Sequence, residues 1–221
     1  MPHFNVVNGG AHAANDLDFQ KFMLAPLGAP SLAEAVRAGA EIYGRLKARL
    51  ASEGQPTGLG DEGGFAPDID RPEDVLRVLV SAIEDGLAED DWDGWTRLTA
   101  RLGSRVQLMG DDIFVTDPAT IARAVTRKVG NSSLIKVNQI GTVTETLEAM
   151  RICREAGCTQ MVSHRSGETP DAFIADLAVG TGCGQIKSGA PARGERVARY
   201  DRLLEIADAH PVDLRFGVVA P

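Results

Sequence analysis

The sequence predicts an α/β fold in which a parallel β-sheet is built from repeated strand–helix units. Apolar segments typical of strands begin at residues 106, 133, 160 and 184, every 24 to 27 residues, and an amphipathic helix pattern follows each of them. Strands that alternate with helices at this period form right-handed βαβ units. A chain of 221 residues, 43% of them hydrophobic, can bury the core of one α/β barrel domain.

Capping residues support the helices that this period requires. Asp117 precedes Pro118, which is favoured at the first position of a helix. Thr142 and Glu145 have the spacing of a capping box. Gly157 stands just past the end of a predicted helix, where a left-handed residue is common.

The first half of the chain is less regular. Residues 4–7 and 22–26 are typical of short strands, and residues 31–52 of an amphipathic helix. Asp70 has the features of an N-cap for a second helix. Residues 78–83 fit either the end of that helix or a strand, because so short an apolar run has no decisive periodicity.

The composition argues against several function classes. The formal net charge is −8 and the pI is near 5.0, with no long basic run, so we expect neither a nucleic-acid nor a membrane-surface partner. Three cysteines without metal-site spacing indicate reduced thiols. The first residues lack the pattern of a signal peptide, and no apolar run is long enough for a membrane span. We therefore expect a cytoplasmic protein.

Lys136 interrupts the strand pattern in SLIKVNQIG, residues 133–141, because it stands where an apolar residue is expected before Val137 resumes the strand. Two interpretations stay open from this stretch alone. A lysine in an edge strand extends its ammonium group to solvent. A desolvated lysine has a lowered pKa and accepts protons.

Polar residues recur near the C-terminal ends of successive predicted strands, at Asp111, Lys136, His164 and Lys187. In a βα barrel the functional residues lie at this end of the strands. The glycine-rich loop at residues 58–67 is either a simple turn or a loop that aims an unshielded carboxylate at a ligand.

Eight segments, in order, resemble the motifs of one family: NGGAHA (8–13), DFQKFM (18–23), GDEGGFAP (60–67), IEDGLAEDDWDGW (83–95), GDDIFVT (110–116), LIKVNQIGT (134–142), VSHRSGET (162–169) and GQIKSGAPARGERVARYDRLL (184–204). The chain resembles the C-terminal barrel domain of the enolase family over residues 1–209, and residues 210–221 form a divergent tail. The resemblance implies an enolase-type, TIM-like βα barrel.

Enolases dehydrate 2-phosphoglycerate to phosphoenolpyruvate with Mg²⁺. The resemblance implies that Lys136 takes the proton beside the carboxylate and that Glu62 is the acid that assists loss of the hydroxyl group. Glu84 and Asp111 would be magnesium ligands, and the hard cations would stabilise the doubly charged enediolate. Six further residues would hold the carboxylate, hydroxyl and phosphate groups of the substrate: His12, Gln20, His164, Arg165, Ser166 and Lys187.

The sequence departs from the family pattern in three places. The N-terminal α+β domain that precedes the barrel in enolases has no counterpart, which we expect to leave the site open. A strand with an aspartate metal ligand, and its helix, are missing near residues 78–86, where VLVSAIEDG resembles both flanks of the deletion. Lys21 stands where enolases carry a glutamate of the pair that serves the leaving hydroxyl group. We therefore expect an incomplete barrel that lacks about one βα unit.

Three functions stay open. The first is a magnesium-dependent lyase acting on a 2-phosphoglycerate-type substrate, a small phosphorylated carboxylate. The second is a transferase like carboxyphosphonoenolpyruvate synthase of phosphinothricin-type antibiotic pathways, for which Lys21 would add a cation. The third is a non-catalytic enolase remnant or subunit. Because the missing unit exposes strand edges, we expect a homodimer or a partner chain to supply the missing parts.

Overall fold

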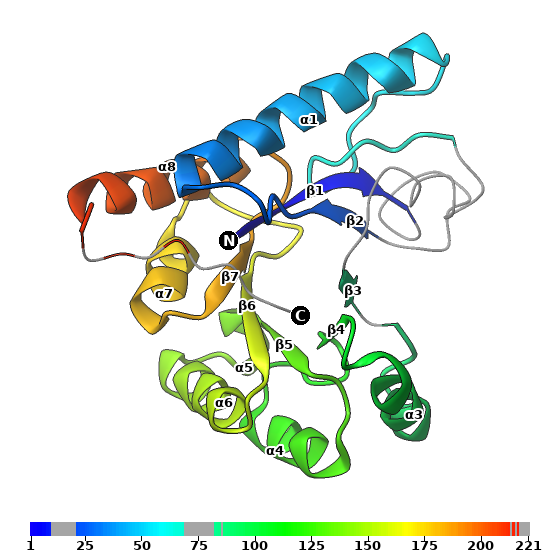
Figure 1. The fold of residues 1–221 in the computed structure, drawn as a ribbon, viewed down its shortest axis with the longest axis vertical. Helices are drawn as coiled ribbons and strands as arrows, with labels where there is room; N and C mark the ends of the chain where they lie inside the picture. Colours follow the sequence, from blue (N-terminus) through cyan, green and yellow to red (C-terminus); the bar gives the residue numbers. More distant parts are fainter. Residues whose placement is uncertain (10–20, 69–81, 85, 213, 215, 217–221) are drawn as a thin grey trace. The chain divides into compact units, whose positions relative to one another are not determined.

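The computed structural model describes residues 1–9, 21–68, 82–84, 86–212, 214 and 216 (Figure 1). The chain forms two compact units. The first comprises Met1–Val80 and His164–Val218, and the second comprises Ser81–Ser163 and Val219–Pro221. None of the described helices is long and apolar enough to cross a lipid bilayer.

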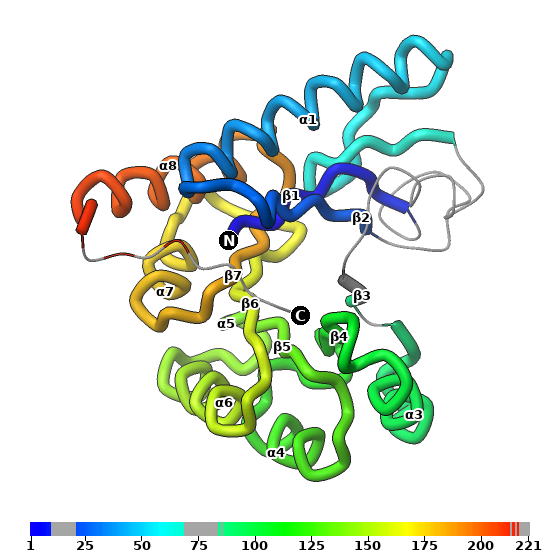
Figure 2. Tube along the Cα trace, viewed as in Figure 1, coloured from blue at the N-terminus to red at the C-terminus, as the bar shows by residue number. Residues whose placement is uncertain are grey.

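The first unit contains, among its described residues, three strands and three helices: β1 (Pro2–Asn8), β2 (Lys21–Leu24), α1 (Leu32–Ser52), α7 (Phe173–Thr181), β7 (Gly184–Lys187) and α8 (Gly194–Ala209). Strand β1 lies between its two neighbours, antiparallel to β2 and parallel to β7 (Figure 2). The strands predicted at residues 4–7 and 22–26 are confirmed, and each observed end lies within two residues of the predicted one. Helix α8 ends at Ala209, the residue before the predicted divergent tail.

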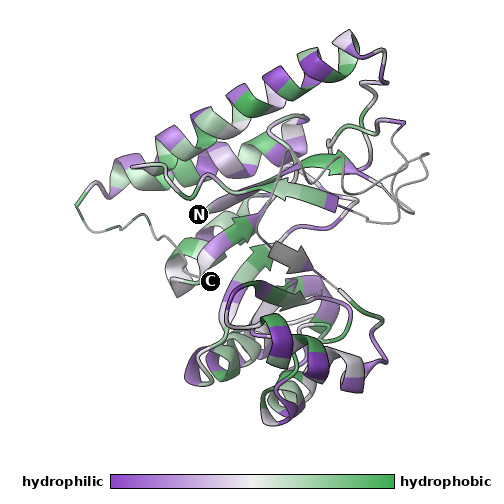
Figure 3. Ribbon diagram, turned by 45° about the vertical axis from the view of Figure 1, so that its right-hand side comes forward, coloured by the Kyte–Doolittle hydropathy of each residue, from purple (hydrophilic) through white to green (hydrophobic). Residues whose placement is uncertain are grey.

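Helix α1 packs on β1 through a residue without a side chain. A Cβ atom at Gly39 would lie 2.5 Å from the ring of Phe4, so only glycine allows this approach. The Phe4 ring also packs on Tyr200 of α8, with 4.9 Å between centroids. Hydrophilic and hydrophobic residues alternate along α1, as an amphipathic helix requires (Figure 3). Ser31 caps this helix, because its hydroxyl accepts the Glu34 N–H.

The second unit contains, among its described residues, four strands and four helices: β3 (Ala82–Glu84), α3 (Trp92–Leu102), β4 (Gln107–Gly110), α4 (Pro118–Arg127), β5 (Ser132–Ile135), α5 (Val137–Ile140), α6 (Val143–Glu155) and β6 (Thr159–Ser163). The strands are parallel in the order β3-β4-β5-β6. This alternation of strands and helices confirms the predicted βαβ units.

The core of the second unit is built where α3, α4 and α6 pack on β4. Trp95, Leu108, Phe114 and Ile121 are its large buried members. The predicted helix caps are confirmed: Asp117 accepts a hydrogen bond from the Thr120 N–H at 2.8 Å, and the Thr142 hydroxyl accepts one from the N–H three residues later. All three cysteines are free thiols, as expected.

Two expectations near the strand ends have clear outcomes. Val137 does not continue strand β5: it begins the short helix α5, because the Lys136 N–H donates to the hydroxyl of Thr116 instead of to a neighbouring strand. Ala82–Glu84 form strand β3, which supports the strand interpretation for the end of the ambiguous segment. The helix expected after Asp70 lies outside the described residues.

Candidate active site

Lys136 and Asp111 form a buried ion pair in the second unit. Asp111 follows β4 and is 4% exposed, and Lys136 follows β5 and is 8% exposed. The Lys136 ammonium group donates to Oδ2 of Asp111. The lysine therefore does not extend to solvent, and the snorkelling interpretation is wrong.

Two further side chains complete this lysine–aspartate cluster, which comprises Asp111, Thr116, Lys136 and Gln139. Gln139 donates from Nε2 to Oδ1 of Asp111 at 3.0 Å. The Thr116 hydroxyl donates to Oε1 of Gln139 at 2.7 Å and accepts the Lys136 N–H at 2.9 Å. Both oxygens of the buried carboxylate are thus satisfied.

The turn that delivers Thr116 is strained. Val115 and Thr116 have φ values of 45° and 56°, a left-handed conformation that β-branched residues rarely adopt. Each such residue costs on the order of 1–3 kcal/mol. In this conformation the Thr116 hydroxyl accepts the backbone N–H of Lys136.

Glu84 is the last residue of β3 and is half-buried. In the parallel register it lies opposite Met109, two residues before Asp111, and Gly110 lies opposite Ser133 of the next strand. Glu84, Asp111 and Lys136 therefore stand at the same end of three adjacent strands. Among the residues that the structure describes, no group of three or more His, Cys, Asp or Glu side chains is arranged to hold a metal ion.

Glu62 is the centre of a second cluster, which lies in the first unit and which we call the glutamate cluster: Asn5, Lys21, Glu62 and His164. The Glu62 side chain is 2% exposed. Its Oε1 lies 3.0 Å from Nζ of Lys21, and its Oε2 lies 3.2 Å from Nε2 of His164 and 3.3 Å from Nδ2 of Asn5. The loop therefore turns this carboxylate inward, where these three side chains surround it, and its role toward a ligand stays a prediction.

The glycines of this loop instead allow close packing. A Cβ atom at Gly64 would lie 2.4 Å from Oδ1 of Asn8, and one at Gly60 would lie 2.9 Å from the same side chain. The Phe65 N–H donates to Val6, and the Asn8 N–H donates to Phe65, so the loop is held against β1. Only residues without side chains let the loop approach this closely.

His164 is fixed as one neutral tautomer. Its Nδ1 faces Nη1 of Arg196, which can only donate, so Nδ1 accepts and the ring proton lies on Nε2, facing Glu62. Burial lowers the pKa of His164 to about 4, although Glu62 acts to raise it. Burial alone would raise the pKa of Glu62, but the His164 hydrogen bond and the charges of Lys21 and Lys187 bring it well below its usual range.

Two buried arginines of α8 organise the loop that follows β6. Arg196 donates to the carbonyl oxygens of Arg165 at 2.8 Å and Ser166 at 2.6 Å. Arg199 donates to Glu168 at 2.5 Å. Ser166 is half-buried and the Arg165 side chain is exposed.

The remaining residues expected to bind substrate have different positions. Lys187 is the last residue of β7 and is fully buried, and its carbonyl accepts the His164 N–H at 3.1 Å. His12 and Gln20 lie outside the described residues.

Sequence reasoning did not single out Asn5, Thr116, Gln139 or Arg196. Three of them stand inside motifs that carried the resemblance, whereas nothing in the sequence marks Asn5.

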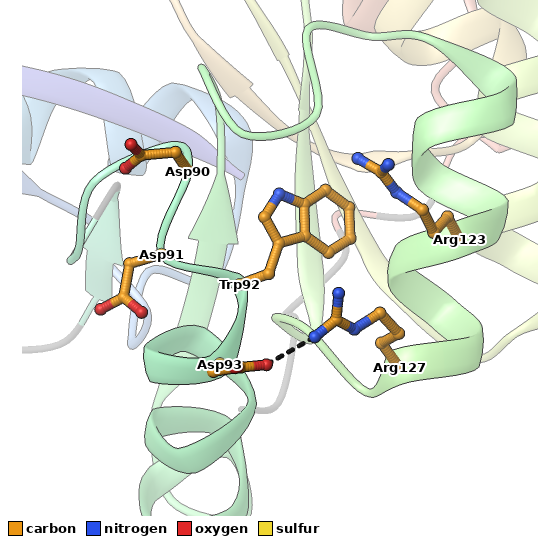
Figure 4. Close-up of a pocket in the computed structure, with 6 residues that line it drawn as sticks. All are labelled: Asp90, Asp91, Trp92, Asp93, Arg123 and Arg127. Atoms are coloured by element: carbon orange, nitrogen blue, oxygen red, sulfur yellow. Dashed lines mark hydrogen bonds and ion pairs between the residues drawn. The ribbon is translucent and has the colours of Figure 1, made fainter.

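A separate pocket of about 280 Å³ lies in the second unit between α3 and α4 (Figure 4). Arg123 stacks on the ring of Trp92, with 3.9 Å from its guanidinium carbon to the ring centroid, and Arg127 pairs with Asp93 at 2.6 Å. The arginines are thus engaged in contacts with α3 and its N-terminus. We assign this pocket no part in the chemistry.

Comparison with known proteins matches most of the chain to one family. The family described as enolase, C-terminal TIM barrel domain, matches residues 1–84 and 79–215. The chain belongs to the enolase family. It is 46% identical over 267 residues to the protein named Enolase of Rubrobacter xylanophilus (strain DSM 9941), and the alignment covers 95% of this chain and 62% of that relative.

Both comparisons reveal the expected internal deletion in this enolase-family chain. The two matched segments overlap at residues 79–84, so the same residues match both flanks of a gap. The alignment with the relative extends over 267 residues, more than the 221 of this chain, so residues of the relative have no counterpart here. The predicted fold, an incomplete enolase C-terminal barrel, is confirmed.

Proposed function

We propose that this chain is a magnesium-dependent enolase-type lyase that removes the proton beside the carboxylate of a small phosphorylated acid such as 2-phosphoglycerate. The observation that carries the proposal is the buried Lys136–Asp111 pair at the ends of adjacent parallel strands. Membership of the enolase family supports the same chemistry.

Lys136 is the proton acceptor in this proposal. Its side chain is buried against Asp111, and only its neutral amine form can accept a proton. The neutral amine would accept the carbon-bound proton, and the carboxylate would take up the electron pair as an enediolate.

The donors at this end of the sheet fit Mg²⁺ in chemical type. Glu84 and Asp111 would supply carboxylate oxygens, and both stand at the C-terminal ends of adjacent parallel strands. Magnesium commonly keeps several waters and needs few protein ligands. When bound, it stabilises the charge that develops on the substrate carboxylate.

The family resemblance assigns the binding of the anionic substrate groups to residues that belong to the first unit. Lys187 contributes a buried charge, and Arg165 and Ser166 stand together on the loop that Arg196 holds. His164 contributes a neutral donor. His12 and Gln20 keep the binding roles that the family resemblance implies.

The lyase proposal is tested by incubating the chain with 2-phosphoglycerate and excess Mg²⁺ in D₂O. NMR measures exchange of the C2 proton, and ultraviolet absorbance measures the enol product. Lys136→Met should abolish both signals, whereas Lys47→Met, a change at an exposed lysine of α1, should leave them unchanged. Absence of both signals in the unaltered chain would reject the proposal.

The metal ligands are tested separately by calorimetric titration with Mg²⁺. Asp111→Asn should weaken binding at least about tenfold, because the site loses a charged oxygen ligand. The matched control is Asp112→Asn, which changes the exposed neighbouring residue and should keep the affinity. Equal affinities for the two variants would remove Asp111 from the ligand set.

A second candidate is the transferase reaction that joins an enolpyruvyl unit to phosphonoformate. It is favoured by Lys21, which puts a cation beside Glu62 where the family has an acid. Phosphoenolpyruvate, phosphonoformate and Mg²⁺ should then give a new phosphonate signal in the ³¹P NMR spectrum, together with an equal amount of the inorganic phosphate that leaves phosphoenolpyruvate. A spectrum without that signal would reject this candidate.

A further inference from the structure

We propose that Lys21 keeps Glu62 ionised and thereby removes the proton donor that dehydration requires, so that this chain removes the carbon-bound proton faster than it expels the hydroxyl group. The inference rests on the proposed function and deepens it. It assigns Lys21 the control of whether the reaction proceeds past proton removal.

Among the described residues, the contacts of the Glu62 carboxylate leave no place for a proton. Lys21 approaches Oε1 at 3.0 Å, and the Nε2–H of His164 and the amide of Asn5 approach Oε2 at 3.2 and 3.3 Å. All three neighbours are oriented as hydrogen-bond donors. A protonated carboxyl group would need an acceptor for its O–H, and none of these three atoms offers one.

His164 cannot change its role to provide that acceptor. Its Nδ1 accepts from Arg196, a side chain with donors only, so its proton stays on Nε2. The charges that act on Glu62 include those of Lys21, Lys187, Arg196 and His164 when protonated, and all of these favour the carboxylate. The cluster is therefore built to hold an anion.

Lys21 is held in this position by the fold. It is the first residue of β2 and pairs in register with Asn8 of β1, and the loop that carries Glu62 is hydrogen-bonded to the same strand. Its side chain is 11% exposed. Removing one partner of such a buried pair leaves an uncompensated charge. Lys21 is therefore one half of a buried ion pair that the fold holds together.

Dehydration requires a proton donor for the leaving hydroxyl group as well as a base for the C2 proton. Lys136 takes the C2 proton, and the C–H electron pair passes through the enediolate into the new C2–C3 double bond as the C3–O bond breaks. The oxygen keeps the electrons of that bond and leaves as water only if an acid supplies a proton. An ionised Glu62 has none, and the Lys21 ammonium is stabilised in its charged form by the same ion pair.

The test is a charge change at residue 21, measured on both steps. With 2-phosphoglycerate and Mg²⁺ in D₂O, the unaltered chain should exchange the C2 proton and release little enol product. Lys21→Glu should raise the ratio of elimination to exchange on the order of 10²-fold, the typical contribution of a general acid. Lys21→Gln, which removes the cation without adding an acid, should give an intermediate ratio.

The matched control is Lys47→Glu, the same charge reversal on the exposed face of α1, which should leave the ratio unchanged. A ratio for Lys21→Glu equal to or below that of the unaltered chain would overturn the inference. Absence of exchange in every variant would instead reject the proposed function.

A second measurement decides the Lys21 assignment without any activity. In protein labelled with ¹³C-carboxyl glutamate, the Glu62 signal is identified by its loss in Glu62→Gln. Lys21→Met should move its titration to a measurably higher pH, while Lys47→Met should not. An unmoved titration would show that Lys21 does not hold Glu62 ionised.

Discussion

Arg196 holds His164 in the tautomer that presents the Nε2 proton to Glu62. The same guanidinium group donates to the carbonyl oxygens of Asp61, Arg165 and Ser166. Arg196 thus links the histidine to the loop that carries Glu62 and to the loop after β6. It acts as a positioning residue, because its described contacts are with His164 and with the backbone of these two loops.

Arg196→Lys should disturb both the histidine and the two loops. Lysine keeps the charge but lacks the planar fork that reaches several acceptors at once. The carbonyl oxygens left without a donor should together cost about 3 kcal/mol of stability. Thermal unfolding measures this loss, and ¹⁵N NMR of the His164 ring measures the tautomer, which should become mixed.

The control for that change is Arg202→Lys on the same helix. The Arg202 side chain is 41% exposed and pairs with Asp176 at 2.7 Å, so its replacement should change the melting temperature little. If His164 kept a pure Nε2–H tautomer in Arg196→Lys, the positioning role would be wrong, whatever happened to the stability.

Acid should destabilise the first unit in a defined pH range. Burial lowers the pKa of His164 to about 4 and, with the charges of the N-terminal amino group and Lys187, that of His3 to about 3. Below pH 6.5 the unfolded chain binds protons that the folded chain does not. Stability is therefore full above about pH 6.5 and falls toward pH 4, by at most about 1.4 kcal/mol per pH unit for each histidine.

The variant His3→Gln isolates one of the two histidines. It should make the fall of melting temperature between pH 6.5 and 4 shallower by about half, because one proton fewer is taken up on unfolding. His210→Gln, at an exposed position after α8, is the control and should keep the original slope. A melting temperature that did not vary over this range would contradict the neutral buried histidines.

The sequence predicted those parts of the fold that depend on local signals. Asp117 and Thr142 cap helices as expected, and the strand starts followed the apolar pattern. These features depend on residues that are close in sequence, so patterns of a few residues identify them. The family motifs also named Lys136, Asp111, Glu62 and His164 as site residues, and the structure places each at a strand end or in a buried cluster.

Contacts between distant residues were outside the reach of the same reasoning. Val137 fits a strand by its own properties, and helix α5 begins there because Thr116, from a strained turn after β4, takes the backbone N–H of Lys136. Glu62 looked exposed among glycines, whereas Lys21, Asn5 and His164 bury it from three other segments. Such contacts are set by tertiary packing, which no local pattern encodes.

The glycine-rich loop offers a direct test of why its glycines are there. At Gly64 a Cβ atom would lie 2.4 Å from Oδ1 of Asn8 and 3.1 Å from Oδ1 of Asn5, whereas at Gly58 it would meet nothing within 4 Å. Gly64→Ala should therefore displace the loop or the asparagines and cost about 1–3 kcal/mol. Gly58→Ala should be neutral or stabilising by about 0.5 kcal/mol, because alanine restricts the unfolded chain.

Thermal unfolding of the two variants under identical conditions separates the two roles of the loop. If the glycines serve close packing against β1, only Gly64→Ala should lower the melting temperature. The same variant should shift the Glu62 carboxyl signal, because Asn5 contacts both Glu62 and the space beside Gly64. If both variants melted at the temperature of the unaltered chain, the glycines would not be needed for packing. The unshielded-carboxylate interpretation would then return as the explanation of the sequence GLGDEGGFAP.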